Sequence, residues 1–161
     1  MKKCMSSVVG KSCALAAVLL ASACGQSVVL AGDKGTKDEA VAQVKKAIEF
    51  IKANGKDKAF SAISNSKGQF VDRDLYVVVY DLNAKCLAHG ANAKMIGRDL
   101  IDAKDVDGKE YMKERVELMK KSATAWQDYK FRNPTSSQVE PKSMYLERSD
   151  DLIIGCGVYN K

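Results

Sequence analysis

The sequence predicts an α+β fold in which helices cover a five-stranded antiparallel sheet. Three observations predict it. Apolar residues recur every three or four positions between Val41 and Ile51, which is the period of an amphipathic helix. Leu75–Gly90, LYVVVYDLNAKCLAHG, has the composition and the turn of a β-hairpin. Three further strand-like segments follow a helical connection, and such a sheet needs a helical layer over its core face.

The first half of the folded part is predicted as two helices followed by the hairpin. Asp38 is expected to cap the first helix, and Asn54-Gly55 ends it. A shorter helix is expected over residues 56–63, and Asn65–Gly68 breaks it. The hairpin then joins two strands through an Asp-Leu-Asn-Ala turn, and its first strand is expected at the centre of the sheet.

The second half is predicted as loops, one helix and three strands. Asp107-Gly108 gives a turn signal within a polar loop. A helix follows, on which Met112, Val116 and Met119 form an apolar stripe. The last three strands are expected at residues 126–131, 142–148 and 152–159.

Residues 1–31 have the pattern of a secretory signal peptide. Lys2, Lys3 and Lys11 precede a short apolar run, SCALAAVLLASA, and small residues follow that run. The apolar run is too short to span a bilayer comfortably, although a retained membrane anchor is the alternative. Export predicts a periplasmic or secreted bacterial protein.

Two cleavage sites fit this leader. A cut after Ala31 leaves residues 32–161 as a single domain, and this is the favoured site. A cut after Ala23 instead resembles a bacterial lipoprotein signal, in which Cys24 would be lipidated. The protein is expected to contact the membrane only if Cys24 carries a lipid.

The charge of the chain argues against nucleic-acid binding, and its cysteine content leaves two redox states open. The leader holds three lysines, so the remaining 23 basic and 20 acidic residues give a net charge of +3. That charge is scattered and is not the footprint of a nucleic-acid-binding protein. Cys86 and Cys156 remain after cleavage, and the sequence is compatible either with a disulfide between them or with two buried thiols.

Three separated blocks of the sequence resemble a known family. They are GQFVDRDLYVVVYDLNAKCLAHGANAKMIGRDLIDAKDVDGKEY, WQDYKFRNP and VEPKSMYLERSDDLIIGCGVY, and together they resemble the single Cache domain type 2 family over Asp38 to Lys161. The resemblance implies a PAS-like Cache fold, with an N-terminal helix along a five-stranded antiparallel sheet. It also implies an extracytoplasmic domain that senses small organic acids. Because Lys161 follows the last predicted strand so closely, a free-standing exported Cache protein is expected.

The resemblance places the ligand pocket on one face of the sheet, beneath the connection between the second and third strands. Binding a small carboxylate there needs a few convergent donors on an apolar wall. Arg115 shares a helical face with Tyr111, and His89 ends the second strand as a donor or a pH-sensitive contact. The candidate ligand-binding residues are His89, Tyr111, Arg115, Trp126, Tyr129, Lys142 and Tyr145.

Strand periodicity qualifies this set. Trp126 and Tyr129 are three residues apart, so regular pleating sends them to opposite faces, and the same holds for Lys142 and Tyr145. By the same rule, Cys86 and His89 are expected on opposite faces.

We therefore expect a binding protein for a small carboxylate such as acetate, propionate, lactate or pyruvate. The alternative is a periplasmic interaction subunit that partners a separate membrane receptor or sensor kinase. Enzymatic activity through a cysteine nucleophile is disfavoured, because the sequence holds a single histidine to serve as its base. Neither a metal ion nor another cofactor is expected, since the sequence offers no complete set of ligands.

Overall fold

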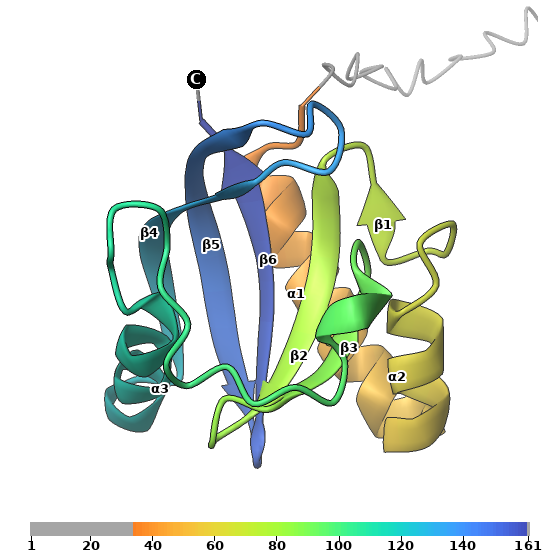
Figure 1. The fold of residues 1–161 in the computed structure, drawn as a ribbon. Coiled ribbons are helices and arrows are strands. Elements are labelled where there is room, and N and C mark those ends of the chain that lie inside the picture. The colour runs from red at the N-terminus through yellow and green to blue at the C-terminus, as the bar shows by residue number, and fades with distance from the viewer. Residues whose placement is uncertain (1–33, 161) are drawn as a thin grey trace, which may run out of the picture. The chain divides into compact units, whose positions relative to one another are not determined.

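The computed structural model describes residues 34–160 and confirms the predicted α+β fold (Figure 1). The strongly periodic segments became helices and the β-branched and aromatic segments became strands, as their compositions dictate. None of the helices in this range is long and apolar enough to cross a membrane. The elements are α1 (Lys37–Asn54), α2 (Lys56–Ile63), β1 (Val71–Asp72), β2 (Leu75–Asp81), β3 (Cys86–His89), the 3₁₀ helix η1 (Ala93–Met95), α3 (Tyr111–Lys121), β4 (Thr124–Arg132), β5 (Val139–Ser149) and β6 (Leu152–Tyr159).

The sheet of the described region is antiparallel and has six strands, one more than expected. Its order is β1-β2-β6-β5-β4, and β3 pairs with β2 on the same edge as β1. The additional strand, β1, has only two residues, which is too short to show an alternating pattern. The expectation that β2 lies at the centre is wrong, because β6 takes that place between β2 and β5. All eight residues of β6 are buried, as a central strand requires.

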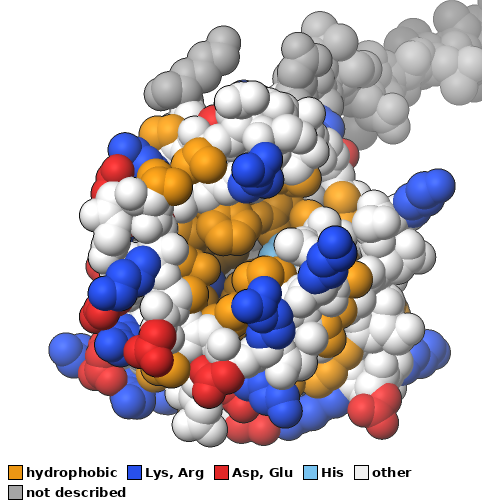
Figure 2. Space-filling model, viewed as in Figure 1, with side chains coloured by type: hydrophobic (Ala, Val, Ile, Leu, Met, Phe, Trp, Pro, Cys, Tyr) orange, Lys and Arg blue, Asp and Glu red, His pale blue; other side chains and the backbone are white. Residues whose placement is uncertain are grey.

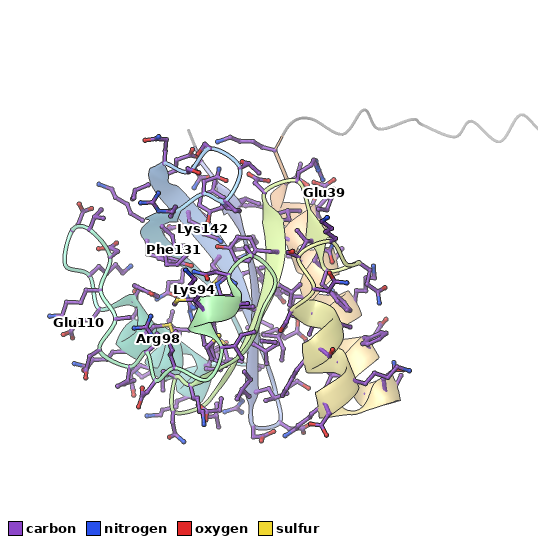
Figure 3. All side chains as sticks on the ribbon, turned by 45° about the vertical axis from the view of Figure 1, so that its right-hand side comes forward. Glu39, Lys94, Arg98, Glu110, Phe131 and Lys142 are labelled. Carbon is purple, nitrogen blue, oxygen red and sulfur yellow. The ribbon has the colours of Figure 1, made fainter. Side chains whose placement is uncertain are left out.

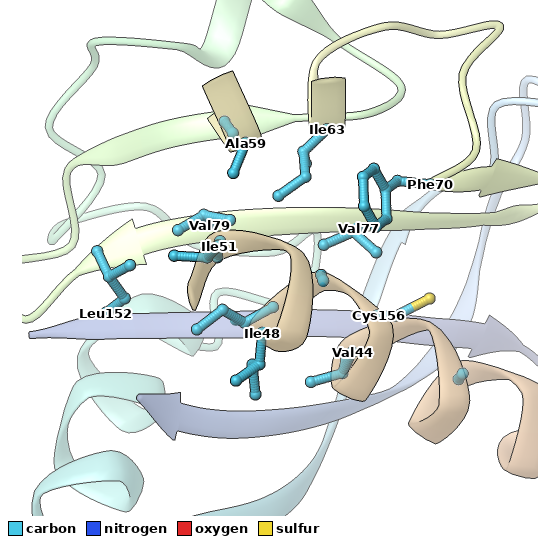
Figure 4. Close-up of a cluster of buried hydrophobic side chains, with 14 of the residues drawn as sticks. Val44, Ile48, Ile51, Ala59, Ile63, Phe70, Val77, Val79, Leu152 and Cys156 are labelled. Carbon is cyan, nitrogen blue, oxygen red and sulfur yellow. The ribbon is translucent and has the colours of Figure 1, made fainter. Parts of the chain in front are cut away.

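Each face of the sheet carries its own buried cluster. On one face, α1 and α2 pack against Val77, Val79 and Ile154, and the cluster is almost wholly aliphatic (Figures 1 and 4). On the other face, the connection between β3 and β4, including α3, covers a cluster rich in tyrosine and methionine. This second face, called here the tyrosine face, also holds the buried polar side chains His89, Arg115 and Lys142.

A β-bulge in the hairpin decides which side chains reach the tyrosine face. Val79 pairs with Ala88 and Tyr80 pairs with Cys86, so Leu87 is an extra residue on β3. The extra residue shifts the alternation by one position, and Cys86 and His89 therefore lie on the same face. The expectation that they lie on opposite faces is wrong for this reason.

The two cysteines of the folded part are free thiols. Cys86 packs in the cluster on the tyrosine face, whereas Cys156 packs in the aliphatic cluster on the other side of the sheet. Because the sheet separates them, the thiol alternative describes this structure.

Thr36, two residues before Asp38, caps helix α1 and forms a capping box with Glu39. The Thr36 hydroxyl accepts from the backbone N–H of Glu39 at 3.3 Å, and the Glu39 carboxylate accepts from the backbone N–H of Thr36 at 2.8 Å. Thr36 is therefore the N-cap, and Asp38 lies inside the first turn. The cap fixes where the helix starts along the sheet.

We predict that Thr36→Ala lowers the free energy of unfolding by about 1 kcal/mol, because it removes half of the capping box. Asp38→Asn removes only a charge near the helix N-terminus and should cost about 0.5 kcal/mol. Urea denaturation of both variants tests this ranking. A larger loss for Asp38→Asn would contradict the assignment of the cap.

Candidate functional site

A hollow of about 310 Å³ opens on the tyrosine face (Figure 2). Figure 2 shows hydrophobic side chains lining it, the histidine at its wall and basic side chains around its mouth. Strands β2 and β3, the segment after β3, the end of β4 and the turn that follows β4 all contribute to it. Its lining residues are Tyr76, His89, Ala91, Asn92, Phe131, Arg132 and Pro134.

A second hollow, of about 440 Å³, is lined by residues of β4, β5 and the loop before α3; Lys142 lines it too, but several of its other charges are already paired. Asp107 forms an ion pair with Lys130, and Lys109 forms one with Glu114. Asp105 accepts hydrogen bonds from three backbone N–H groups, those of residues 107, 109 and 130. These paired groups satisfy one another, so apart from Lys142 nothing in this hollow calls for a ligand.

Lys142 lies beside the first hollow, with only 1% of its surface exposed. Its Nζ is 3.9 Å from the centre of the Tyr76 ring and 5.9 Å from that of Phe131, and both rings line the hollow. Figure 3 shows Lys142 close to Phe131. A carbon atom added at Gly157 would lie 2.6 Å from Lys142 Cε, so the glycine leaves room for this side chain. Burial lowers the pKa of Lys142 to about 7.

Three hydrogen bonds meet at the phenol oxygen of Tyr159. Tyr159 donates its single proton to the Arg132 carbonyl at 2.8 Å. It must therefore accept from the Tyr76 hydroxyl, 3.0 Å away, and it also accepts from Lys142 Nζ at 3.2 Å. The Tyr159 oxygen is then saturated, while the Lys142 ammonium retains two N–H donors. The hydrogen-bond donors here outnumber the available acceptors, and such an arrangement suits an anionic ligand.

Arg115 is the second buried cation on this face, and it is fully buried. Its guanidinium carbon lies 5.2–5.4 Å from the centres of the Tyr80, Tyr111 and Tyr129 rings. Its Nε donates to the Gln127 amide oxygen at 3.1 Å, and its Nη2 has no hydrogen-bond partner. Its Nη1 lies 3.3 Å from the Met112 sulfur, so the site holds this charge with aromatic faces, one neutral amide and a thioether.

Neither cation is paired with an acidic side chain. Every ion pair formed within residues 34–160 joins other residues. A buried charge is costly unless it is paired, and the aromatic rings compensate only in part.

His89 is held as a neutral ring at the wall of the hollow. Its Nδ1 accepts from the backbone N–H groups of Ala91 and Asn92, at 3.2 and 3.0 Å, and the ring stacks on Tyr76. Burial lowers the pKa of His89 to about 3, and the positive charge of Lys142 adds to the effect. His89 therefore stays neutral between pH 5 and 8, and the alternative of a pH-sensitive contact does not fit this environment.

The structure brings together five of the seven candidate residues and separates two. His89 lines the hollow, Lys142 lies beside it, and Tyr111, Arg115 and Tyr129 form the adjoining part of the tyrosine face. The remaining two, Trp126 and Tyr145, are on the opposite face. There the two rings pack against each other in a tilted arrangement with centres 5.4 Å apart, and Trp126 is 39% exposed. The alternation predicted for the two strands is confirmed, and it removes Trp126 and Tyr145 from the site.

Sequence reasoning missed three aromatic residues of the site. Tyr76, Phe131 and Tyr159 all contact Lys142, yet they lie on three different strands. Tyr159 is the cross-strand partner of Lys142, so correct pairing of the last two predicted strands would have identified it.

The thiols of this region are poorly suited to catalysis. Burial raises the pKa of Cys86 to about 11 and that of Cys156 to about 12, so both are protonated at neutral pH. No group of three potential metal-ligating side chains occurs within residues 34–160.

We predict that Lys142→Met changes how stability depends on pH. The folded-state pKa of Lys142 is below its unfolded value, so the unfolded chain binds more protons between pH 7 and about 10. The wild type should therefore gain stability relative to Lys142→Met as pH rises from 6 to 9. Urea denaturation at several pH values measures this difference.

Met144→Leu, two residues away on the same face, is the matched control, because it removes no charge. Its difference from the wild type should stay constant with pH. A constant difference for Lys142→Met as well would show that Lys142 is not held in a charge-disfavouring site.

Comparisons with known proteins agree with the observed fold. A 90-residue stretch is 32% identical to the methyl-accepting chemotaxis protein McpP of Pseudomonas putida; it is 55% of this chain and only 16% of that receptor. A solved Cache chemosensory domain, described for its carboxylic acid recognition, superposes with a TM-score of 0.66 at 24% identity, over 77% of this chain and 92% of that one. A solved periplasmic sensor domain of a chemotaxis protein gives a TM-score of 0.62 at 21% identity, over 77% and 90%.

These relatives are named as receptors and sensor domains rather than as enzymes. The sequence profile of the family called Single Cache domain 2 matches residues 29–161. That range includes every element of the sheet and both cations of the tyrosine face. The chain belongs to the Single Cache domain 2 family.

Proposed function

We propose that this chain is an extracytoplasmic sensory domain that binds a small organic carboxylate. The observation that carries the proposal is the presence of two buried cations, Lys142 and Arg115, that have no acidic partner in the described part of the chain. A carboxylate ligand would supply the missing negative charge to a surface that already offers unused donors.

The size and lining of the hollow favour a short acid. Its volume of about 310 Å³ is at the small end for ligand sites, and aromatic rings make up much of its wall. Acids of the acetate, propionate, lactate or pyruvate type place one carboxylate beside a short apolar chain. The carboxylic acid recognition described for a structural relative supports the same ligand class.

We propose a periplasmic or secreted location for the mature domain. The leader pattern of residues 1–31 and the periplasmic relative support it. The leader, both cleavage sites and Cys24 lie outside the residues that the structure describes, so lipidation stays a prediction. We also propose that the protein binds rather than converts its ligand, since its buried thiols stay protonated.

A signalling partner follows from the kinship with chemotaxis receptors. We propose that the ligand-bound domain acts on signalling domains of that type. Cross-linking of the native envelope with and without ligand would reveal such a partner. Recovery of the same proteins in both states would count against a ligand-controlled contact.

We predict that a small carboxylate raises the thermal stability of the purified chain. A ligand present at 100 times its Kd adds about 2.7 kcal/mol when it binds only the folded state. A thermal-shift panel of acetate, propionate, lactate and pyruvate, with amino acids, amines and purines for comparison, tests this. Shifts from the amines alone, or from no compound, would overturn the proposal.

Lys142→Met should weaken carboxylate binding at least about 30-fold, because it removes the charge that the ligand pairs with. Trp126→Phe is the matched control, since this side chain lies on the opposite face of the sheet and should leave Kd unchanged. Isothermal titration calorimetry measures both. Unchanged affinity in Lys142→Met would place the carboxylate elsewhere.

We predict that carboxylate affinity falls as pH rises above about 7. Binding requires the Lys142 ammonium, and above its pKa of about 7 the free protein must take up a proton to bind. Above pH 7, Kd should therefore rise by up to about tenfold per pH unit. Below pH 6, Kd should change little as long as the acid itself stays ionised. An affinity that is flat from pH 6 to 9 would exclude Lys142 as the charged partner.

A further inference from the structure

We infer that His89 determines which acids this pocket prefers: its Nε2–H binds an oxygen on carbon 2 of the ligand, which favours 2-hydroxy and 2-oxo acids over unsubstituted alkanoates. The inference rests on the proposed function and adds a named specificity residue to it.

The first step is the proton on the imidazole. Two backbone N–H groups, those of Ala91 and Asn92, point at Nδ1 from 3.2 and 3.0 Å. A nitrogen that accepts two hydrogen bonds cannot itself carry a proton, so the neutral ring carries its proton on Nε2. The segment after β3 thus fixes His89 as a donor through Nε2.

The second step is the position of that donor. The imidazole ring is stacked on Tyr76, with ring centres 5.2 Å apart and planes inclined by 23°. The backbone N–H of His89 is also anchored, at 3.4 Å from the Ser64 hydroxyl. His89 is 2% exposed and lines the hollow, and within residues 34–160 its Nε2 has no hydrogen-bond partner. A fixed, unused donor therefore faces the space where a ligand would lie.

The third step is the division of roles between the two polar groups at Tyr76. The centre of the Tyr76 ring lies 3.9 Å from Lys142 Nζ and 5.2 Å from the centre of the neutral His89 imidazole. A carboxylate prefers the ammonium, because charge-assisted hydrogen bonds are about twice as strong as neutral ones. The imidazole donor is then left for a second, uncharged acceptor on the same small ligand.

The fourth step concerns acids that lack this acceptor. Acetate, propionate and isobutyrate present only C–H groups beyond the carboxylate. They would exclude water from the hollow while leaving Nε2–H unpaired, and a site built around a hydrogen bond discriminates strongly against such analogues. Lactate and pyruvate carry an oxygen on carbon 2, so they avoid that loss.

The test compares lactate with isobutyrate and pyruvate with propionate by isothermal titration calorimetry on the purified chain. Lactate and isobutyrate have nearly the same shape and differ by a hydroxyl in place of a methyl group. The wild type should bind the oxygen-bearing acid of each pair at least about tenfold more tightly.

His89→Phe keeps an aromatic ring against Tyr76 and removes the donor. It should reduce both ratios to about one, because propionate and isobutyrate no longer leave a donor unpaired and lactate and pyruvate lose their extra hydrogen bond. Trp126→Phe, on the opposite face, should keep the wild-type ratios. Equal affinities within each pair in the wild type, or ratios that survive in His89→Phe, would overturn the inference while leaving carboxylate binding intact.

Nitrogen NMR of the wild-type protein supplies a readout that needs no variant. The imidazole of His89 should show an unprotonated Nδ1 and a protonated Nε2, and lactate should shift the Nε2 resonance more than isobutyrate does. A proton on Nδ1 would overturn the inference even if His89→Phe fails to fold. If no acid of the panel binds at all, the proposed function fails and this inference fails with it.

Discussion

The tyrosine face is organised by the need to keep two cations in a layer from which water is largely excluded. Removing an ammonium or a guanidinium from water is costly, and no acidic side chain of the described region forms an ion pair with either cation. The protein surrounds them instead with aromatic rings, one phenol oxygen and the Gln127 amide. Gly157 leaves space for the Lys142 chain, and the stacked tyrosines around Arg115 leave it little freedom to turn toward solvent. The carboxylate proposed above would complete the charge of this arrangement.

The aliphatic face of the sheet stabilises the fold, and we propose that the tyrosine face binds the ligand. The face under α1 and α2 is an aliphatic cluster with few buried polar groups. Burying it therefore stabilises the fold and requires few compensating hydrogen bonds. The opposite face carries tyrosines, methionines and the two cations, which is a poor composition for a core and a suitable one for a site. Strands β2, β5 and β6 contribute side chains to both faces of the sheet. The stable aliphatic cluster therefore holds the tyrosine face, with its costly buried charges, in place.

Local sequence patterns predicted the fold well because its elements are strongly periodic, and the resemblance to a known family supplied the sheet arrangement. Alternation also separated Trp126 from Tyr129 correctly, since β4 is regular. It failed for Cys86 and His89, because the bulge at Leu87 inserts one residue, and a single insertion reverses every later side chain. Nothing in a short polar and apolar run marks such a bulge. The aromatic partners of Lys142 were missed for a different reason: they come from β2, β4 and β6, and only strand pairing reveals that they meet.

One phenol oxygen connects the groups that shape the hollow. Tyr159 receives a hydrogen bond from β2 through Tyr76 and another from β5 through Lys142, and it donates to the carbonyl of Arg132 at the end of β4. These three strands are joined there before any ligand arrives, so the direction of each remaining donor is already set. Preorganisation of this kind lowers the entropy lost on binding, which matters most for a ligand with few atoms and few contacts. For the proposed short acid, the orientation of the Lys142 donors would therefore contribute to affinity together with the charge.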